Sequence, residues 1–420
     1  MRRLLTETAD PQPSEHGVVG QVEAAPARPG APSSWELLRA FLRLGATSFG
    51  GPAMVAYIKS MAVTRKGWLS EADFQQGVAL CQTAPGATAM QCAAYVGLRA
   101  RGPWGALLAY VGFGLPAFLL MLSLSVAYRH AVQFQPVVSV FEGLGALVVA
   151  LVANAAWVFG RSSVKRMGDA SICLLTAVLF YLRVNPFLIL LAAGLSGSLL
   201  FRKGVTAPPS DSQRRGSFRT TWGAAVLIFA LGLALVCALA VLDPKLVPLA
   251  LVMMKVDVSA FGGGFASLPL LFREVVAVRH WLSARIFMDG IMLGQLTPGP
   301  IVITSTFVGY QTAGLAGAIV ATASMFLPSF LAVLLLEPVW GRLRSSPTFQ
   351  GATHALVLSF VGLLASLTVQ LVVLTLWKPP SILVASLAFA ALRFRVDVLW
   401  VVLAGMFLIV MATFIQQVVT

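Results

Sequence analysis

The sequence predicts an all-α polytopic membrane protein built from two homologous helical repeats, and three observations lead to this fold class. The 420 residues are 58% hydrophobic and only 11% charged, whereas soluble proteins carry roughly 25% charged residues. Uncharged apolar runs such as 222–242 reach the roughly 20 residues that span a bilayer. The second half of the chain also repeats the first. We expect about 10 to 13 membrane segments, several of them short or interrupted.

The basic residues lie mainly in short loops, although they give the chain a formal net charge of +14. Clusters in 161–166 and 202–219 follow the positive-inside pattern, which orients a membrane protein and does not indicate a nucleic-acid partner. The four cysteines lie in apolar segments without metal-ligand spacing, so we expect no metal site, disulfide or cofactor. Residues 1–33 lack an apolar core and are predicted to form a disordered tail and not a signal peptide.

The internal repeat consists of motifs that recur in the same order. The matches are 48–52 (SFGGP) with 260–264 (AFGGG), 68–70 with 281–283 (both WLS), 82–86 (QTAPG) with 295–299 (QLTPG), 115–116 with 327–328 (both LP), and Phe141 with Phe349. We therefore expect a first membrane repeat at 34–203, a basic loop and linker helix at 204–246, and a second membrane repeat at 247–420.

The linker helix decides the topology of the second repeat. If each repeat crosses the membrane an even number of times, one added crossing inverts the second repeat, which is the usual architecture of secondary transporters. The loop charges of the first repeat fit a cytoplasmic assignment, whereas inversion places Arg273, Arg279 and Arg285 outside. We expect inversion, and the charges of the second repeat alone leave its orientation open.

Each repeat contains two breaks within apolar segments, a glycine cluster and a Pro-Gly pair. Proline removes a hydrogen-bond donor and glycine permits unwound backbone, so both breaks predict discontinuous half-helices. We expect new helices to begin at the two prolines, with Thr297 as an N-cap, so that helix N-termini inside the membrane offer N–H groups to an anion. Close helix packing and simple kinks are the alternative interpretation. The candidate substrate-binding residues at these breaks are Ser48, Gly50, Gly51, Pro52, Gln82, Thr83, Pro85, Gly86, Gly262, Gly263, Gly264, Gln295, Thr297, Pro298, Gly299 and Pro300.

Charged residues within apolar segments add further candidates. Arg43 and Lys255 stand at equivalent positions, seven residues before the glycine clusters, and are expected to attract the anion. The alternatives are that Arg43 reaches the membrane interface and that Lys255 pairs with Asp257. Glu142 and Asp257 are the candidates for coupling to protons, although Gln350 occupies the position equivalent to Glu142.

The motifs FGGP (49–52), WL (68–69), QTAPG (82–86) and QLTPGP (295–300) together resemble the chromate ion transporter family, in particular its long, two-domain bacterial members. The resemblance implies efflux of chromate across the bacterial cytoplasmic membrane, sulfate as a structural mimic, and oppositely oriented halves. The expected partners are chromate, sulfate-like oxyanions and the lipid bilayer, and a homodimer is a candidate assembly. The second repeat has Gly264 where the first has Pro52, and the first repeat has Ala87 where the second has Pro300. We therefore expect the two halves to contribute unequally to the site.

Three classes of function are compared. A secondary transporter that exports chromate would be driven by the membrane potential, a proton gradient or both, since the chain has no P-loop motif for ATP. A passive oxyanion channel is the alternative. A membrane-embedded enzyme would require His, Asp or Cys residues clustered within one segment, and the sequence has no such cluster. The sequence therefore favours a transporter and not an enzyme.

Overall fold

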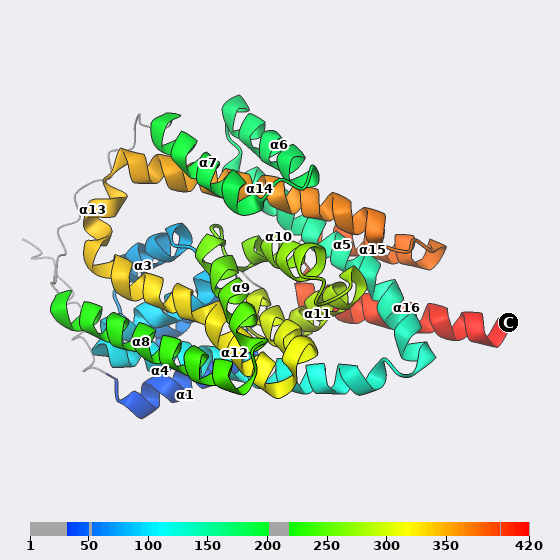
Figure 1. Ribbon diagram of the computed structural model, residues 1–420, viewed down its shortest axis with the longest axis horizontal. Helices are drawn as coiled ribbons and strands as arrows, with labels where there is room; N and C mark the ends of the chain where they lie inside the picture. Colours follow the sequence, from blue (N-terminus) through cyan, green and yellow to red (C-terminus); the bar gives the residue numbers. More distant parts are fainter. Residues whose placement is uncertain (1–31, 50–52, 201–217, 395, 420) are drawn as a thin grey trace, which may run out of the picture.

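The computed structural model describes residues 32–49, 53–200, 218–394 and 396–419, and the regular elements in these ranges are helices throughout (Figure 1). The all-α prediction is therefore confirmed. The predicted tail up to residue 31 and the basic loop at 201–217 lie outside the described residues.

The first repeat contains α1 (Ser34–Thr47), α2 (Ala53–Lys59), the π-helical turn η1 (Ser60–Arg65), α3 (Glu71–Thr83), α4 (Thr88–Ala131), α5 (Gln135–Ser163), α6 (Met167–Tyr181) and α7 (Pro186–Leu200). The linker helix α8 (Phe218–Leu242) follows. The second repeat contains α9 (Leu246–Ser259), η2 (Gly264–Ala266), α10 (Ser267–Leu271), η3 (Phe272–Val278), α11 (Ala284–Leu296), η4 (Ile301–Ile303), α12 (Thr304–Leu336), η5 (Glu337–Val339), α13 (Trp340–Arg344), α14 (Pro347–Leu374), α15 (Pro379–Arg393) and α16 (Val398–Val419).

The two repeats have matching helices in the same order. α1 and α9 are each 14 residues long, and α3 and α11 are each 13 residues long. The repeated Trp-Leu-Ser motif is explained by capping, because Ser70 and Ser283 accept backbone hydrogen bonds at the starts of α3 and α11, at 3.1 and 3.3 Å. Both long helices, α4 and α12, leave helical geometry at equivalent points, 101–102 and 313–314.

Each of these interruptions turns the chain back on itself. In α4 it separates a short arm (88–100) from a long arm (103–131), and the two arms pack closely because a Cβ added to Gly97 would lie 2.2 Å from the carbonyl oxygen of Gly105. The arms of α12 make the same glycine contact. Only glycine permits helices to approach so closely, which explains the glycine pair on either side of each turn.

The half-helices form two hairpins in the first repeat, and both begin and end on the same side. Glu36, near the start of α1, pairs with Lys66, which follows η1, at 2.8 Å. The hydroxyl of Tyr95, in the short arm of α4, donates to the carbonyl oxygen of Asp73, near the start of α3, at 3.2 Å. The tip of the second hairpin is buried, with Ala84 at 2% and Ala87 at 1% exposure, as the predicted break at Pro85 and Gly86 requires.

Four described helical stretches are long and apolar enough to cross a membrane, namely Thr88–Ala131, Val140–Ser163, Ile301–Arg344 and Pro347–Leu374. Shorter apolar helices from α6, α7, α8, α15 and α16 accompany them. Their outward side chains are apolar, for example Leu174 at 68% exposure and Phe407 at 64%, which suits contact with lipid. The total of 10 to 13 segments, several of them short or interrupted, stays a prediction.

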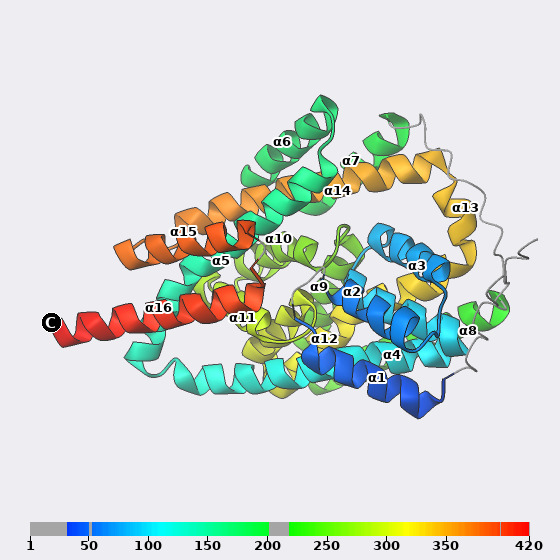
Figure 2. The same cartoon turned by 180° about the vertical axis from the view of Figure 1, so that it is seen from behind.

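The helices are arranged in two layers. α1 to α4 and α8 to α12 form the hairpin layer, and α5 to α7 and α14 to α16 form an interlocked layer. In this second layer α6, α7, α14 and α15 lie on one side of the hairpin layer, whereas α5 and α16 reach the level of α11 (Figures 1 and 2). In the interlocked layer the repeats exchange partners, since α14 packs against α6 and α7, and α5 packs against α15 and α16. Neither repeat therefore completes its own packing.

The long helices of the two repeats run in opposite directions (Figure 1). Near the end of α4, Tyr128 donates to Asp289 of α11 at 2.6 Å, whereas Glu337, which follows α12, pairs with Arg99 in the short arm of α4 at 3.2 Å. The molecule thus has a Lys66 end, where α1 and α3 start and α12 finishes. It also has a Glu142 end, where α5 and α11 start and α4 finishes.

Candidate substrate site

The two Pro-Gly tips meet the opposite repeat at the centre of the hairpin layer. The N–H of Gly86 donates to the carbonyl oxygen of Ala260 at 2.8 Å, and the N–H of Gly299 donates to that of Ser48 at 2.9 Å. Both glycines have positive φ, +109° and +106°, which is accessible to glycine and strained for other residues. The repeated breaks therefore hold the two repeats together through backbone hydrogen bonds.

The unwinding predicted around the Pro-Gly pairs is present, but the predicted helix starts are wrong. α4 begins at Thr88 and η4 at Ile301, each three residues after its proline. Thr297 ends α11, and its hydroxyl donates to the carbonyl oxygen of Gly294 at 2.8 Å, so it is not an N-cap. The Gly after each proline adopts positive φ and delays the helix.

A cavity of about 650 Å³ lies between the two layers and reaches these breaks. The breaks of both repeats line it, with Gln82, Gly262, Gly263, Gly264 and Pro300 among the lining residues. α5 and α14 contribute the opposite wall through Phe159, Ser162, Ser163 and Val357. We call this space the central cavity. Lys59 lines the central cavity and pairs with Glu71 at the start of α3. Because α3 starts at the Lys66 end of the molecule, the central cavity lies toward that end.

The start of α4 also faces the central cavity. Thr88 lines it, and neither α4 nor η4 has a side-chain hydrogen bond that caps its N-terminus. The first N–H groups of a helix carry partial positive charge and bind anions readily. The site therefore offers hydroxyl, amide and backbone donors, with Lys59, whose ammonium also pairs with Glu71 at 2.6 Å, as the charged residue of the lining.

Arg43 and Lys255 lie outside the central cavity. Arg43 is exposed on α1. The ammonium of Lys255 lies 2.9 Å from the carboxylate of Glu274 and 3.8 Å from the ring centroid of Phe187. The alternative pairing of Lys255 with Asp257 is wrong, because residues two apart point to different faces of a helix.

Asp257 is buried and bonded to Ser329 instead. Its carboxylate accepts hydrogen bonds from the N–H and the hydroxyl of Ser329 at 2.7 and 2.6 Å. The hydroxyl of Ser329 in turn accepts from the N–H of Ala87, in the first tip, at 3.2 Å. At the equivalent positions the first repeat has Gly45 and Ala117. The second repeat thus supports the tip of the first through a polar pair that has no counterpart.

Glu142 occupies a different place, at the start of α5. It pairs with Arg285 at 3.1 Å and with Lys378 at 3.5 Å, which are both from the second repeat. This cluster marks the Glu142 end of the molecule and is separate from the central cavity. Coupling of Glu142 or Asp257 to protons stays a prediction.

Two candidate residues carry polar atoms without a partner. Among the described residues, neither the hydroxyl of Ser48 nor the side-chain amide nitrogen of Gln295 has a hydrogen bond, although both atoms are buried. Neither residue is on the lining of the central cavity, so these atoms do not face a ligand bound there. Thr83 is satisfied locally by the carbonyl oxygen of Ala79. Gly50, Gly51 and Pro52 lie outside the described residues.

Three residues in or near the site, Lys59, Thr88 and Ser329, are not among the residues predicted from the sequence. Lys59 stands close to the basic residues 65–66, and Thr88 opens the long α4, so neither stands out in the sequence. Ser329 was overlooked, although a signal existed: the second repeat replaces two small residues of the first, Gly45 and Ala117, by a carboxylate and a hydroxyl. Such paired replacements indicate direct contact.

The fold and the site define a multi-pass membrane transporter of two repeats, and comparison with known proteins gives its family. The family model described as chromate transporter matches residues 35–198 and 247–410. The chain belongs to the chromate transporter family, which is a family of transporters and not of enzymes.

Full-length relatives agree with this assignment. An uncharacterized transporter of Methanocaldococcus jannaschii is 40% identical over 90% of this chain and 94% of its own length. A chromate transport protein of Cupriavidus metallidurans is 33% identical over 91% of this chain and 92% of its own length. A probable chromate transport protein of Synechococcus elongatus is 31% identical over 84% of this chain and 88% of its own length. No solved structure matches the chain.

Proposed function

We propose that the protein is a secondary transporter that exports chromate from the cytoplasm and binds it in the central cavity. The observation that carries the proposal is the convergence of the breaks of both repeats on one cavity of about 650 Å³. Chromate and sulfate are tetrahedral dianions of similar size, so a site of backbone, hydroxyl and amide donors accepts both. The bacterial cytoplasmic membrane is the proposed location.

The asymmetry between the two ends supports alternating access. Val55, Gln82 and Phe159 line the open cavity, whereas their counterparts Ser267, Gln295 and Leu367 are packed inside the protein: Ser267 and Leu367 are 0% exposed, and the amide nitrogen of Gln295 is buried. An inverted pair of repeats can exchange these two arrangements, which would close the Lys66 end and open the Glu142 end. Inversion in the membrane is supported by the opposite directions of α4 and α12.

The membrane potential is sufficient to drive the proposed export. Moving one charge through 100 mV is worth about 2.3 kcal/mol, so a dianion gains about 4.6 kcal/mol when it leaves an interior that is negative. Proton coupling is therefore an addition and not a requirement. Closure of one end favours a transporter over a passive channel, because a channel requires a path that is open at both ends at once.

The proposal is tested with labelled chromate in inside-out vesicles, with and without a potential that is positive inside the vesicle. We expect potential-driven uptake that saturates with chromate and is inhibited by sulfate. Thr88→Val keeps the shape of the side chain but removes the hydroxyl from the cavity, and should raise the half-saturating chromate concentration. Thr312→Val, whose hydroxyl is bonded within α12, is the matched control. Uptake that rises linearly with chromate would indicate a channel.

A further inference from the structure

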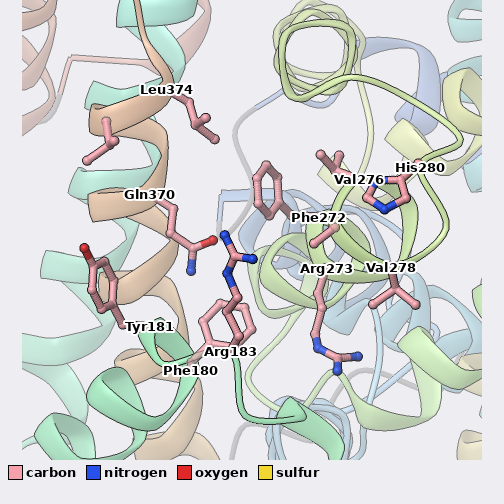
Figure 3. Close-up of a pocket in the computed structure, with 12 residues that line it drawn as sticks. Phe180, Tyr181, Arg183, Phe272, Arg273, Val276, Val278, His280, Gln370 and Leu374 are labelled. Atoms are coloured by element: carbon pink, nitrogen blue, oxygen red, sulfur yellow. The ribbon is translucent and has the colours of Figure 1, made fainter.

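A second cavity of about 650 Å³ lies between the two layers, among α6, α14 and η3 (Figure 3). One wall carries Gln370 and Leu374 of α14, and the facing wall carries Phe272, Arg273 and Val276 (Figure 3). The loop after α6 closes the bottom of this view, and its Arg183 points its guanidinium into the space beside Gln370 (Figure 3). We call this space the basic pocket.

The basic pocket belongs to the end of the molecule opposite the central cavity. His280 lines it and is followed closely by Arg285, which pairs with Glu142. Gln370 is the repeat counterpart of Ser162, which lines the central cavity. In the alternating-access cycle proposed above, on which this placement rests, the basic pocket lies at the mouth of the closed route.

Arg183 and Arg273 line the basic pocket, and Glu274, Lys255 and Arg279 lie next to the lining residues in an ion-pair cluster with Arg273. The carboxylate of Glu274 is 2.9 Å from Lys255, 3.4 Å from Arg273 and 3.8 Å from Arg279. Among the described residues, no carboxylate lies within ion-pair distance of Arg183. Three cations thus share the carboxylate of Glu274, and Arg183 adds a fourth positive charge, which leaves a local excess that favours binding of an anion with more than one negative charge.

The backbone supports a binding role independently of the charges. Arg183 and His280 are the non-glycine residues with positive φ in the described part of the chain, at +62° and +53°, and both line the basic pocket. At the position equivalent to His280 the first repeat has Gly67, with φ of +60°. The second repeat keeps the same backbone but accepts strain of about 1 kcal/mol to place an imidazole there. Strain of this kind concentrates at functional sites.

We propose that the basic pocket binds a tetrahedral oxyanion group through Arg183 and Arg273, with His280 and the amide of Gln370 as further donors. Guanidinium groups bind such oxyanions by two parallel hydrogen bonds. The group is carried either by a free dianion of the sulfate or chromate type, or by the phosphate of an anionic lipid. Exposed apolar residues at the rim, such as Val373 at 73% exposure, fit acyl chains in the second case. This site is distinct from the central cavity and does not depend on the direction of transport.

The test counts sulfate ions bound to the purified full-length protein in nanodiscs of zwitterionic phosphatidylcholine, at constant ionic strength. We expect two sulfates per chain for the wild type and one for Arg183→Gln or Arg273→Gln. Arg393→Gln, which removes a cation that lies over Trp157 and outside both cavities, should keep two. If the wild type binds a single sulfate and Arg183→Gln binds none, the basic pocket is supported and the central site is not.

A second arm identifies the carrier of the oxyanion group. In nanodiscs that contain phosphatidylglycerol, retained lipid is measured by native mass spectrometry. If the wild type binds one sulfate in both nanodiscs but retains more phosphatidylglycerol than Arg183→Gln does, the lipid phosphate is the occupant. If neither sulfate binding nor lipid retention changes in Arg183→Gln and Arg273→Gln, the proposal is overturned.

Discussion

Replacing Gly86 by alanine tests whether the tip contacts hold the two repeats together. A Cβ at this position would lie 1.8 Å from the hydroxyl oxygen of Ser329, whereas ordinary contact begins near 3.4 Å. The tip and the side chain of Ser329 would have to separate by about 1.6 Å, the difference between these distances. That movement breaks the hydrogen bonds from Gly86 to Ala260 and from Ala87 to Ser329.

The expected loss of stability follows from these contacts. The positive φ of Gly86 costs an alanine about 1 to 3 kcal/mol. Each buried donor left without a partner costs a further 1 to 3 kcal/mol or so, so Gly86→Ala should lower the free energy of unfolding by roughly 3 to 9 kcal/mol. Gly102→Ala is the matched control: its φ is +69°, but no atom lies within 4 Å of the added Cβ. In the control, the free energy of unfolding should fall only by the cost of backbone strain, about 1 to 3 kcal/mol.

The assay is thermal unfolding in detergent, reported by a dye that reacts with cysteine thiols. Cys81 and Cys92 are buried in the folded protein and react only when it opens. We expect Gly86→Ala to unfold at a clearly lower temperature than Gly102→Ala, and Gly299→Ala, whose Cβ would lie 2.7 Å from that of Ala117, to unfold between the two. Equal unfolding temperatures for Gly86→Ala and Gly102→Ala would refute the claim that the tips bear on stability.

Three further predictions concern transport and topology. Lys59→Gln should raise the half-saturating chromate concentration about tenfold, or about 1.4 kcal/mol, while Arg43→Gln should leave it unchanged; equal effects in vesicle uptake would contradict the assignment of Lys59 to the site. Ser48→Ala should leave thermal stability within about 0.5 kcal/mol, because its hydroxyl has no partner to lose, and should leave sulfate competition unchanged, because Ser48 does not line the central cavity; a large stability loss would argue for a structural role, and weaker competition for a role in binding. Single cysteines at Lys66 and His280 should be labelled by an impermeant thiol reagent from opposite sides of the membrane, and labelling from the same side would end the inverted arrangement.

Much of the fold could be predicted because it depends on local signals. Apolar runs, the Trp-Leu-Ser caps at Ser70 and Ser283, and the Pro-Gly breaks each act within a few residues, so the sequence displays them directly. The turn inside α4 was not predicted. Its signal is Gly97 and Gly105 on either side of Gly102, and glycines at such spacing also occur in straight helices that pack closely.

The candidate site was predicted in part, for a physical reason. Backbone breaks can be located from proline and glycine, and the structure brings Gln82, Gly262 and Pro300 together. The partner of a charge cannot be located in this way, because it depends on which helices become neighbours. Lys255 was expected to face the anion, but η3 places Glu274 beside it. Ion pairs between distant segments are a property of the tertiary packing.

The reciprocal tip bonds also constrain how the chain can fold during synthesis. When the first repeat leaves the ribosome, the N–H of Gly86 has no partner until Ala260 has been made, roughly 170 residues later. At about 5 to 20 residues per second this interval lasts on the order of 10 to 35 seconds. During that time the half-helices of the first repeat are in the bilayer with open polar tips, which bare lipid cannot satisfy. The nascent protein therefore depends on water or on the insertion machinery to shield its centre until its second half arrives.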